Sequence, residues 1–411
     1  MNQTRQTLQQ RIDYTHRFNI KTGRHGWLRL TPAYSVKVVE EIIENSEPHL
    51  SILDPFCGTG TTALSAAGRG HNATTLDVNP FLIWLAGTKT ASYSASVLEG
   101  VEAAGGVAVD LARRQAVDPT PEPPINRIER WWAESTRQFF CYLKSSIAQV
   151  THDDRMMSDL LHVAFCRTLI RLSNATFNHQ SMSFRDKPQS GFDWSLDVGS
   201  FFLADLRFVI RGATENPPGN TSVIQGDARD LPSVLHARFD SVVTSPPYAN
   251  RMSYIRELRP YMYWLGYLTN GRDAGEMDWL AIGGTWGIAT SRLADWSAKG
   301  NCWLPDTITM MLTEIAHNHN ANGVLLANYV MKYFEDMSQH FSGLRGVLNP
   351  GARVHYIVGN STFYGVLVPT EKIYGAMLQQ YGFEDVDVRP IRKRNSKKEL
   401  IEFDVSATWP G

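Results

Sequence analysis

Short apolar segments that end at polar residues constrain the fold of this 411-residue chain more than any other feature. Residues 49–54 (HLSILD), 73–77 (ATTLD) and 222–227 (SVIQGD) each resemble a strand that ends at an aspartate. Residues 239–244 (FDSVVT) lead into a polar loop, and residues 353–358 (RVHYIV) form a fifth apolar run. This layout is typical of a parallel α/β sheet, whose ligands bind beyond the carboxyl ends of the strands.

The spacing of these runs predicts a core with two insertions. A long gap between the second and third runs holds two proline-rich breaks, and the apolar period between the breaks is helical. We therefore expect a mostly helical insertion at residues 91–220 and a second insertion, without a clear period, at residues 258–320. The expected core comprises residues 1–90, 221–257 and 321–411. Residues 384–390 and 400–408 flank a basic turn in the last segment and predict an antiparallel hairpin.

Composition sets broad limits on what the chain can do. It is 43% hydrophobic and 20% charged with a net charge of −1, which is ordinary for a globular protein. A local basic stripe can contact phosphates, so the net charge neither supports nor excludes a nucleic-acid partner. The four cysteines form no C-x-x-C pair, so we expect reduced thiols in the cytoplasm and no metal site. No signal peptide or membrane span is expected either.

A glycine-rich turn, residues 54–62 (DPFCGTGTT), follows the first strand and leads into a helix. Gly58 and Gly60 let the backbone approach a ligand closely, and the free amides of the helix N-terminus can bind a carboxylate. A purely structural turn or a phosphate loop would look similar, although no lysine follows as in a Walker motif. Asp77 ends the next strand and could accept the hydroxyls of a ribose, or simply cap a helix. Asp227 is equally ambiguous.

A second loop, residues 244–248 (TSPPY), follows the fourth strand. Two prolines directly after a buried strand are unusual, because proline ends the hydrogen-bond ladder and fixes φ. Together with DPFCGTGTT, this loop resembles the motif pair of the S-adenosylmethionine-dependent DNA amino-methyltransferases: motif I and motif IV, (D/N/S)-P-P-(Y/F/W). Both motifs stand in order and at matching strand ends, which is more specific than either alone. Without that partner motif, residues 244–248 could be only a rigid loop.

The resemblance implies a class I methyltransferase (Rossmann-like) fold that binds S-adenosylmethionine. In this family the glycine turn holds the methionine part, an acid after the second strand binds the ribose, and an acid after the third lies near the adenine. Residues 30–35, before a predicted helix at 36–44, resemble motif X, beside the methionine end. The expected cofactor-binding residues are Thr31, Pro32, Asp54, Pro55, Phe56, Cys57, Gly58, Gly60, Thr61, Thr62, Asp77, Asn79, Asp227 and Ala228.

Motif IV suits the methylation of an exocyclic amine, whose lone pair is delocalised into the base. An acceptor aimed at the amine can draw the nitrogen toward sp³ geometry and take up charge as the methyl group arrives. Ser245 and the carbonyl of Pro246 can act as such acceptors, and Tyr248 offers a face on which an extruded base can stack. The expected catalytic set is Ser245, Pro246, Pro247 and Tyr248, with no metal.

The first residue of motif IV points to the target base. In the family, serine usually marks cytosine-N4 enzymes, and aspartate or asparagine marks adenine-N6 enzymes. Ser245 therefore predicts N4-methylcytosine in double-stranded DNA, made after base flipping. The expected setting is a restriction-modification or related defence system, in which a cognate endonuclease is a candidate partner. The motif order, X then I then IV, differs from cytosine-N4 enzymes that place motif IV first.

Three alternatives stay open. The first is an adenine-N6 DNA methyltransferase. The second is an RNA or tRNA guanine-N2 methyltransferase, although those usually show Asp-Pro-Pro-Tyr-Gly where this chain has Ser245 and Ala249. The third is a non-catalytic nucleic-acid-binding subunit.

Three polar or basic segments are candidates for DNA contact, because the insertions must supply recognition. Such clusters are also common on solvated faces, but here they suit phosphate binding. The predicted DNA-binding residues are Arg171, Asn174 and Arg185 in the first insertion, Asn250 and Arg251 after motif IV, and Arg392, Lys393 and Arg394 in the terminal hairpin.

Overall fold

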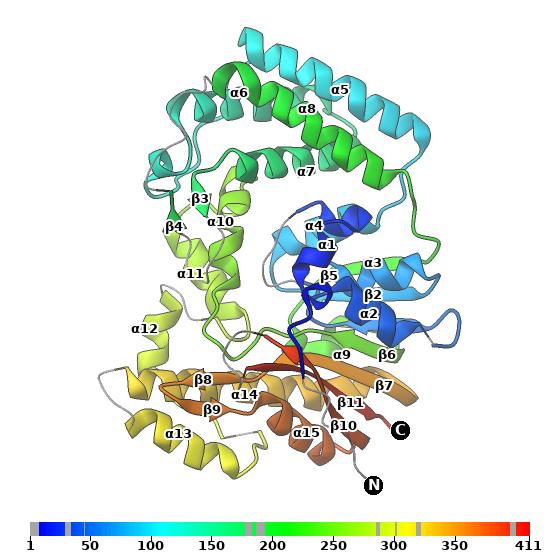
Figure 1. Cartoon of the computed structure of the whole chain (residues 1–411), viewed down its shortest axis with the longest axis vertical. Helices are drawn as coiled ribbons and strands as arrows, with labels where there is room; N and C mark the ends of the chain where they lie inside the picture. The colour runs from blue at the N-terminus through cyan, green and yellow to red at the C-terminus, as the bar shows by residue number, and fades with distance from the viewer. Residues whose placement is uncertain are drawn as a thin grey trace.

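A seven-stranded sheet forms the centre of the computed structural model (Figure 1). The structure describes residues 8–28, 34–44, 46–176, 183–185, 194–284, 288–300, 302–317, 322–394 and 400–411. The strand order is β5-β2-β1-β6-β7-β11-β10, and the first five strands in this order are parallel. The strands are β1 (Ser51–Asp54), β2 (Asn72–Asp77), β5 (Thr221–Gln225), β6 (Phe239–Thr244), β7 (Leu348–Gly359), β10 (Glu384–Lys393) and β11 (Ile401–Thr408).

The last two strands complete the class I methyltransferase sheet. β11 pairs antiparallel with β7, and β10 returns antiparallel along β11, as expected for the terminal hairpin. The five predicted strands and the hairpin are therefore confirmed, with ends shifted by a few residues.

Helices cover both faces of the sheet, and the strand side chains alternate between two apolar clusters. Ile52 and Val243 point to the cluster formed with α2 (Val36–Ile43) and α3 (Thr61–Gly68). Leu53 and Val242 point to the opposite cluster. That second cluster is built with α14 (Gly323–Leu344) and α15 (Thr370–Gln380). A parallel strand covered on both faces is apolar nearly throughout, which explains the burial of five of the six β6 residues.

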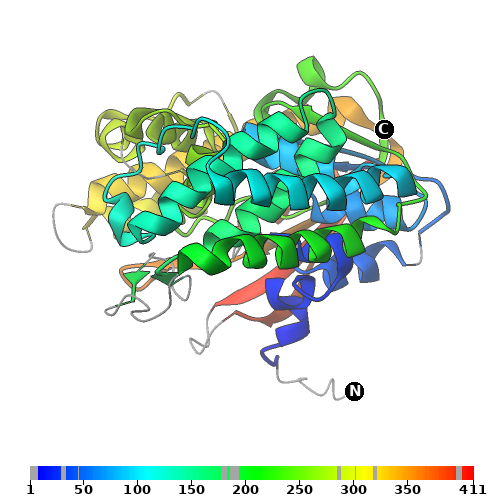
Figure 2. The same cartoon turned by 90° about the horizontal axis from the view of Figure 1, so that it is seen from above.

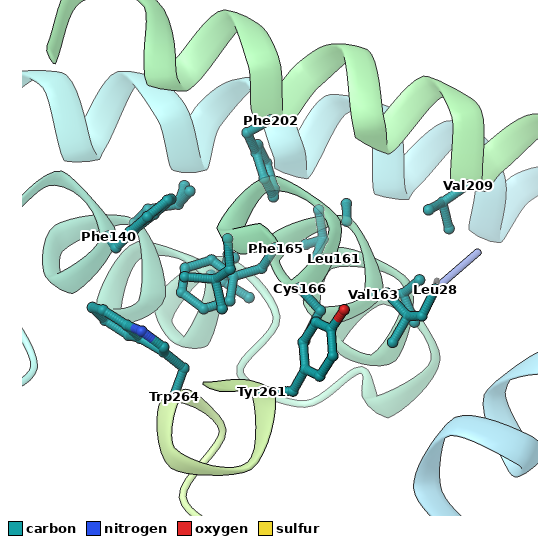
Figure 3. Close-up of a cluster of buried hydrophobic side chains, with 14 of the residues drawn as sticks. Leu28, Phe140, Leu161, Val163, Phe165, Cys166, Phe202, Val209, Tyr261 and Trp264 are labelled. Carbon is teal, nitrogen blue, oxygen red and sulfur yellow. The ribbon is translucent and has the colours of Figure 1, made fainter. Parts of the chain in front are cut away.

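The first insertion forms a helical domain above the sheet in Figure 1. It follows α4 (Pro80–Thr90) and separates β2 from β5 in the chain. Phe140, Leu161, Phe165 and Phe202 fill its core (Figure 3). Its elements are α5 (Ala95–Arg114), α6 (Glu134–Val150), α7 (Arg155–Arg171), α8 (Trp194–Ala213) and the short strands β3 (Ala175–Thr176) and β4 (Ser183–Phe184).

The second insertion is also helical, although its sequence shows no clear period. Its first helix, α10, runs from the sheet toward the helical domain, and its Tyr261 and Trp264 join the core of that domain (Figures 1 and 3). The helices are α10 (Tyr254–Trp264), α11 (Gly271–Leu280), α12 (Ile288–Asp295) and α13 (Thr307–His317). The remaining elements are α1 (His16–Asn19), α9 (Leu231–Val234), β8 (Ser361–Phe363), β9 (Val366–Val368) and the 3-10 turns η1 (Ile12–Tyr14), η2 (Gly23–Gly26), η3 (Ile128–Arg130), η4 (Ala228–Asp230) and η5 (Arg345–Val347).

A buried arginine fastens the helical domain to the sheet domain. The Arg24 guanidinium is almost fully buried and donates to backbone carbonyls at both points where the chain crosses between the domains. On the entering side it binds the carbonyls of Lys89 and Ala91. On the returning side its partners are the carbonyls of Gly212 and Ala213 and the side chain of Asn216. All five N–H groups of the side chain are thus used.

Candidate active site

A pocket opens at the carboxyl ends of four neighbouring parallel strands, where the sequence places its motifs. Its walls enclose about 1000 Å³ that no protein atom fills, including open space at the mouth. The strands β1, β2, β5 and β6 each contribute the residues that directly follow them. The lining residues are Tyr34, Pro55, Phe56, Cys57, Gly58, Thr59, Thr61, Asp77, Val78, Asn79, Leu82, Gly226, Asp227, Ala228, Ser245, Pro247, Tyr254, Ile255, Leu258, Leu280, Ala281 and Ile282.

The glycine turn needs glycine for its backbone shape. Gly58 and Gly60 have φ of +50° and +74°, a region that side chains disfavour. A Cβ on Gly60 would lie 3.0 Å from the Cβ of Ala86 on α4, so the position is also crowded. Gly60 caps α3 without a side-chain hydrogen bond. The first amides of this helix are therefore not capped by that residue and lie at the pocket wall near Thr61.

Asp54 supplies a buried oxygen without a protein partner. Its Oδ1 accepts from the Thr244 hydroxyl at 2.5 Å and from the Phe56 amide at 3.1 Å. Its Oδ2 is buried, and no described residue donates to it. Burial raises the pKa of Asp54 to about 7. An unpaired buried carboxylate oxygen is costly, and the ammonium group of S-adenosylmethionine, bound against the wall that Asp54 supports, would offset part of that cost.

Asp77 holds the glycine turn and faces the pocket. Its carboxylate accepts from the amides of Gly58 at 3.1 Å and Asn79 at 2.9 Å. Burial raises the pKa of Asp77 to about 6. The same turn is tied from behind by Lys89, whose fully buried ammonium donates to the Thr59 carbonyl at 3.0 Å. Burial lowers the pKa of Lys89 to about 7.

Asp227 is engaged by an arginine that also reaches the second insertion. The Arg229 guanidinium binds its carboxylate at 2.6–3.0 Å and donates to the Leu280 carbonyl at 2.7 Å. Burial would raise the pKa of Asp227, but the hydrogen bonds and charge of Arg229 outweigh it and lower the pKa. The pair therefore fixes residues 280–282, which line the pocket, beside the strand end that the sequence assigns to adenine.

The motif IV loop is held in place by hydrogen bonds from three directions. The Ser245 hydroxyl donates to the Ile357 carbonyl of β7 at 2.9 Å, so its lone pairs remain acceptors. The Pro247 carbonyl accepts from the Tyr333 hydroxyl of α14 at 2.8 Å. The Tyr248 amide donates to the Tyr254 hydroxyl of α10 at 3.0 Å. These hydrogen bonds fix the loop, and the Ser245 hydroxyl oxygen is an acceptor from it at the pocket wall.

Most of the predicted site residues meet at this pocket. Asp54, Gly60 and Thr62 do not line it but support its wall: the Thr62 hydroxyl donates to the Val243 carbonyl and contacts Tyr34. Pro246 and Tyr248 are likewise outside the lining. Thr31 and Pro32 fall outside the described residues. The predicted residues that line the pocket are Pro55, Phe56, Cys57, Gly58, Thr61, Asp77, Asn79, Asp227, Ala228, Ser245 and Pro247.

The sequence interpretation missed the wall formed by the second insertion. Tyr254, Ile255 and Leu258 lie on the first turns of α10, whereas Leu280 ends α11 and residues 281–282 follow it. The short distance between motif IV and α10 is the one sequence feature that could have suggested the α10 residues. Nothing local marks residues 280–282, which reach the pocket only through the fold.

The predicted DNA-binding residues have different surroundings. Arg185 and Arg251 are exposed. Arg171 is 46% exposed and lies 3.6 Å from the carboxylate of Asp205. The sequence did not predict that Arg392 binds Glu402 at 2.7 Å and is only 14% exposed.

The four remaining DNA-binding candidates, Lys393 among them, are partly buried. Arg394 stands over the ring of Tyr248, 4.8 Å from its centroid. The Asn174 amide donates to the Trp131 carbonyl, and the side-chain oxygen of Asn250 accepts from the Met252 amide.

Neither a metal-binding cluster nor a membrane-spanning helix occurs among the described residues. No group of three or more His, Cys, Asp or Glu side chains in the described ranges could hold a metal ion. Likewise, no helix in this part of the chain is long and apolar enough to cross a membrane.

The fold and the pocket define a class I methyltransferase that uses S-adenosylmethionine as its methyl donor. The chain is similar to the type II methyltransferase M.BsoBI of Geobacillus stearothermophilus, with 21% identity over 95% of this chain and 84% of that protein. It is also similar to the type II methyltransferase M.MvaI of Kocuria varians, with 20% identity over 90% and 82%. Similarity over most of both relatives supports assignment to the DNA methyltransferases.

The other comparisons add little. No family model matches the chain. Among solved structures, TrmN from Thermus thermophilus aligns with a TM-score of 0.31 and 10% identity, over 96% of this chain and 53% of that one.

Proposed function

We propose that this protein is a DNA methyltransferase that methylates N4 of cytosine in double-stranded DNA after the base has been flipped out. The observation that carries the proposal is the Ser-Pro-Pro-Tyr loop, which opens onto the cofactor pocket with the Ser245 hydroxyl proton already bound to Ile357. Similarity to two type II methyltransferases supports DNA as the substrate.

The chain can activate an amine without a metal or a nucleophilic side chain. When bound, S-adenosylmethionine supplies an electrophilic methyl group on a sulfonium. Ser245 Oγ and the Pro246 carbonyl would accept hydrogen bonds from the amine and so concentrate its lone pair on nitrogen. Because the loop is fixed by Tyr254 and Tyr333, this geometry exists before the base arrives, which favours a near-attack arrangement.

The cofactor would lie along the line of strand ends. Asp54 and the first amides of α3 would hold the methionine end, Asp77 the ribose, and the Asp227–Ala228 turn the adenine. Ser245 would lie beside the methionine end of the cofactor, because the carboxyl ends of β1 and β6 are adjacent in the sheet. This order follows from strand adjacency and from the acid at each strand end.

The proposal that cytosine is the target base rests on Ser245, the first residue of the Ser-Pro-Pro-Tyr motif. A serine at position 245 is neutral and shorter than the aspartate or asparagine typical of adenine-N6 enzymes. Adenine N6 is the alternative amine, because it also lies beside a ring nitrogen and could meet the same acceptors. Pairing with a restriction endonuclease stays a prediction.

DNA is proposed to lie along one side of the molecule. The pair β3–β4 of the helical domain and the hairpin β10–β11 of the sheet domain extend toward the same side (Figure 2). Arg185 follows β4, and Lys393 ends β10. Exposed Arg185 on the helical domain and half-buried Lys393 on the hairpin could therefore contact the backbone of one duplex.

Nucleoside analysis tests the proposal directly. Unmethylated genomic DNA is incubated with the protein and S-adenosylmethionine, digested, and examined by mass spectrometry. We expect N4-methylcytosine. N6-methyladenine would overturn the base assignment, 5-methylcytosine would overturn the amine mechanism, and methylation of RNA alone would overturn the DNA assignment. Cofactor binding without any product would indicate a non-catalytic role.

A further inference from the structure

The ring of Tyr248 is held by the terminal hairpin as well as by its own loop. Its hydroxyl donates to Oε1 of Glu402 at 2.8 Å. Glu402 lies near the start of β11 and is 4% exposed. A buried carboxylate that accepts a phenol proton fixes where the end of that ring lies.

Glu402 is itself fixed by the opposite strand of the hairpin. Arg392 of β10 is its cross-strand neighbour, and its guanidinium donates to Oε2 at 2.7 Å and to Oε1 at 3.1 Å. Two parallel hydrogen bonds from one guanidinium hold a carboxylate in a single plane. Glu402 therefore cannot rotate away from Tyr248 without breaking a buried ion pair.

A second arginine restrains the plane of the same ring. The Arg394 guanidinium lies over Tyr248 and donates to the Asn360 carbonyl at 2.8 Å. The space for both side chains depends on Gly359, where a Cβ would lie 2.4 Å from Arg394 and 2.9 Å from Tyr248. The ring is thus restrained at its hydroxyl and on its face, both times from the hairpin side.

We propose that Glu402 and Arg392 are positioning residues for the flipped target base, acting through Tyr248. The hairpin, and not the motif IV loop alone, would then set the plane on which the base stacks. This inference rests on the proposed function, because it assumes that Tyr248 receives the base. It also gives Arg392 a role inside the target pocket, in place of a contact to a DNA phosphate.

A double-mutant cycle tests the coupling. Tyr248→Phe keeps the ring and removes only the hydroxyl, whereas Glu402→Ala removes its acceptor. We expect each variant to lower kcat/KM for methylation of the mapped DNA site by roughly tenfold, the usual effect of losing a charge-assisted hydrogen bond. The double variant should be little worse than either single variant, because both remove the same contact. Glu402→Gln, which keeps an acceptor oxygen, should lose less activity.

Asp404 provides a matched control on the same strand. It is 3% exposed and pairs with Arg389 across the same hairpin at 3.3 Å, but it faces His355 and not Tyr248. Asp404→Ala should therefore cost stability like Glu402→Ala while leaving base capture unchanged. Base capture is read from the fluorescence of pyrrolocytosine placed at the target position, with thermal unfolding measured on the same samples.

The outcomes separate the two hypotheses. Reduced fluorescence change in Tyr248→Phe and Glu402→Ala, but not in Asp404→Ala, supports the positioning role. Additive losses in the cycle, or equal losses in Asp404→Ala, would overturn it and leave the proposed function intact. If the wild-type protein methylates no DNA, the proposed function fails first, before any variant is compared.

Discussion

At the scale of single residues, two buried carboxylates lie at the pocket: Asp77 lines it, and Asp54 supports its wall. The pKa values of Asp54 and Asp77 are raised to about 7 and about 6 because both are buried. Each pays a desolvation cost when ionised in the free protein, and a bound cation would relieve it. Both acids therefore link cofactor affinity to pH.

We predict that affinity for S-adenosylmethionine rises with pH between 5.5 and 7.5. A cation favours the ionised acids, so binding releases protons, and the affinity gained above their pKa values is lost as the pH falls through about 7 and about 6. The slope is at most about tenfold per pH unit for each proton released. Calorimetry across this range measures it. Asp54→Asn should reduce the dependence of affinity on pH. An unchanged dependence in the Asp54→Asn, Asp77→Asn double variant would show that neither acid causes it.

Asp77 also carries a prediction at constant pH. Asp77→Ala should weaken cofactor binding by about 1–3 kcal/mol, since ribose hydroxyls lose an acceptor and the Gly58 amide loses its partner. Gly58→Val should act more strongly, because φ at this position is +50°. Isothermal titration of both variants gives the values. Wild-type affinity in both would place the cofactor elsewhere.

A substitution at Ser245 is expected to slow catalysis without weakening cofactor binding. Ser245→Ala removes an acceptor that acts mainly as charge develops, so kcat should fall by the equivalent of about 1–3 kcal/mol while cofactor affinity stays unchanged. Single-turnover rates with saturating cofactor measure the chemical step. A variant with normal kcat would show that the Pro246 carbonyl suffices.

At the scale of elements, helix α10 joins the Ser-Pro-Pro-Tyr loop to the helical domain. Tyr254 at its start binds the Tyr248 amide, and Trp264 at its end packs in the core of that domain. Pro260 cannot donate within the helix, and the carbonyl of Arg256 that it would have bonded lies 3.5 Å from Arg259 Nε. The sequence analysis did not predict this helix, because Pro260 stands within it and its last five residues are all buried, which interrupts the apolar period.

The strands were easier to predict than their side-chain partners. Five apolar runs and the hairpin follow from local pattern alone, since both faces of a parallel strand are buried. The Arg392–Glu402 pair depends on hairpin register, and that register is shifted by an irregularity between Pro390 and Arg392. The three basic residues 392–394 therefore looked equivalent in the sequence. In the structure Arg392 is paired with Glu402, Arg394 covers Tyr248, and Lys393 ends the outer strand β10.

This difference predicts unequal salt effects within the hairpin. If Lys393 contacts a phosphate, Lys393→Ala should lower the slope of log affinity against log salt by about 0.9 on every DNA sequence. Arg392→Ala should leave the slope unchanged, because its charge is already paired with Glu402. Binding to non-specific duplexes over a range of salt concentrations measures both. Equal slopes for the two variants and the wild type would mean that this strand end does not contact DNA.

At the scale of the whole molecule, two insertions that are distant in sequence share one apolar core. α10 carries Trp264 into the helical domain, and Arg229 ties residues 280–282 to the cofactor side. Arg24 donates to backbone carbonyls where the chain enters and leaves the helical domain. The sequence indicated both insertions but not their attachment, because these bonds join carbonyls, which every residue has.

Arg24 should therefore control the union of the two domains. Arg24→Met would leave buried carbonyls at both crossings without donors, and we expect the free energy of unfolding to fall by at least about 3 kcal/mol. Arg24→Lys should restore only part of it, because lysine has three donors and no planar fork. Arg207, which is 60% exposed and lies 3.6 Å from Glu102 on the helical domain, gives the control, since Arg207→Met removes only a surface ion pair. Denaturant unfolding and limited proteolysis at residues 91–94 and 214–219 would be compared. Faster cleavage at both crossings in Arg24→Met, with Arg207→Met unchanged, would identify Arg24 as the link between the domains, whereas unchanged cleavage in Arg24→Met would show that the other interdomain contacts suffice.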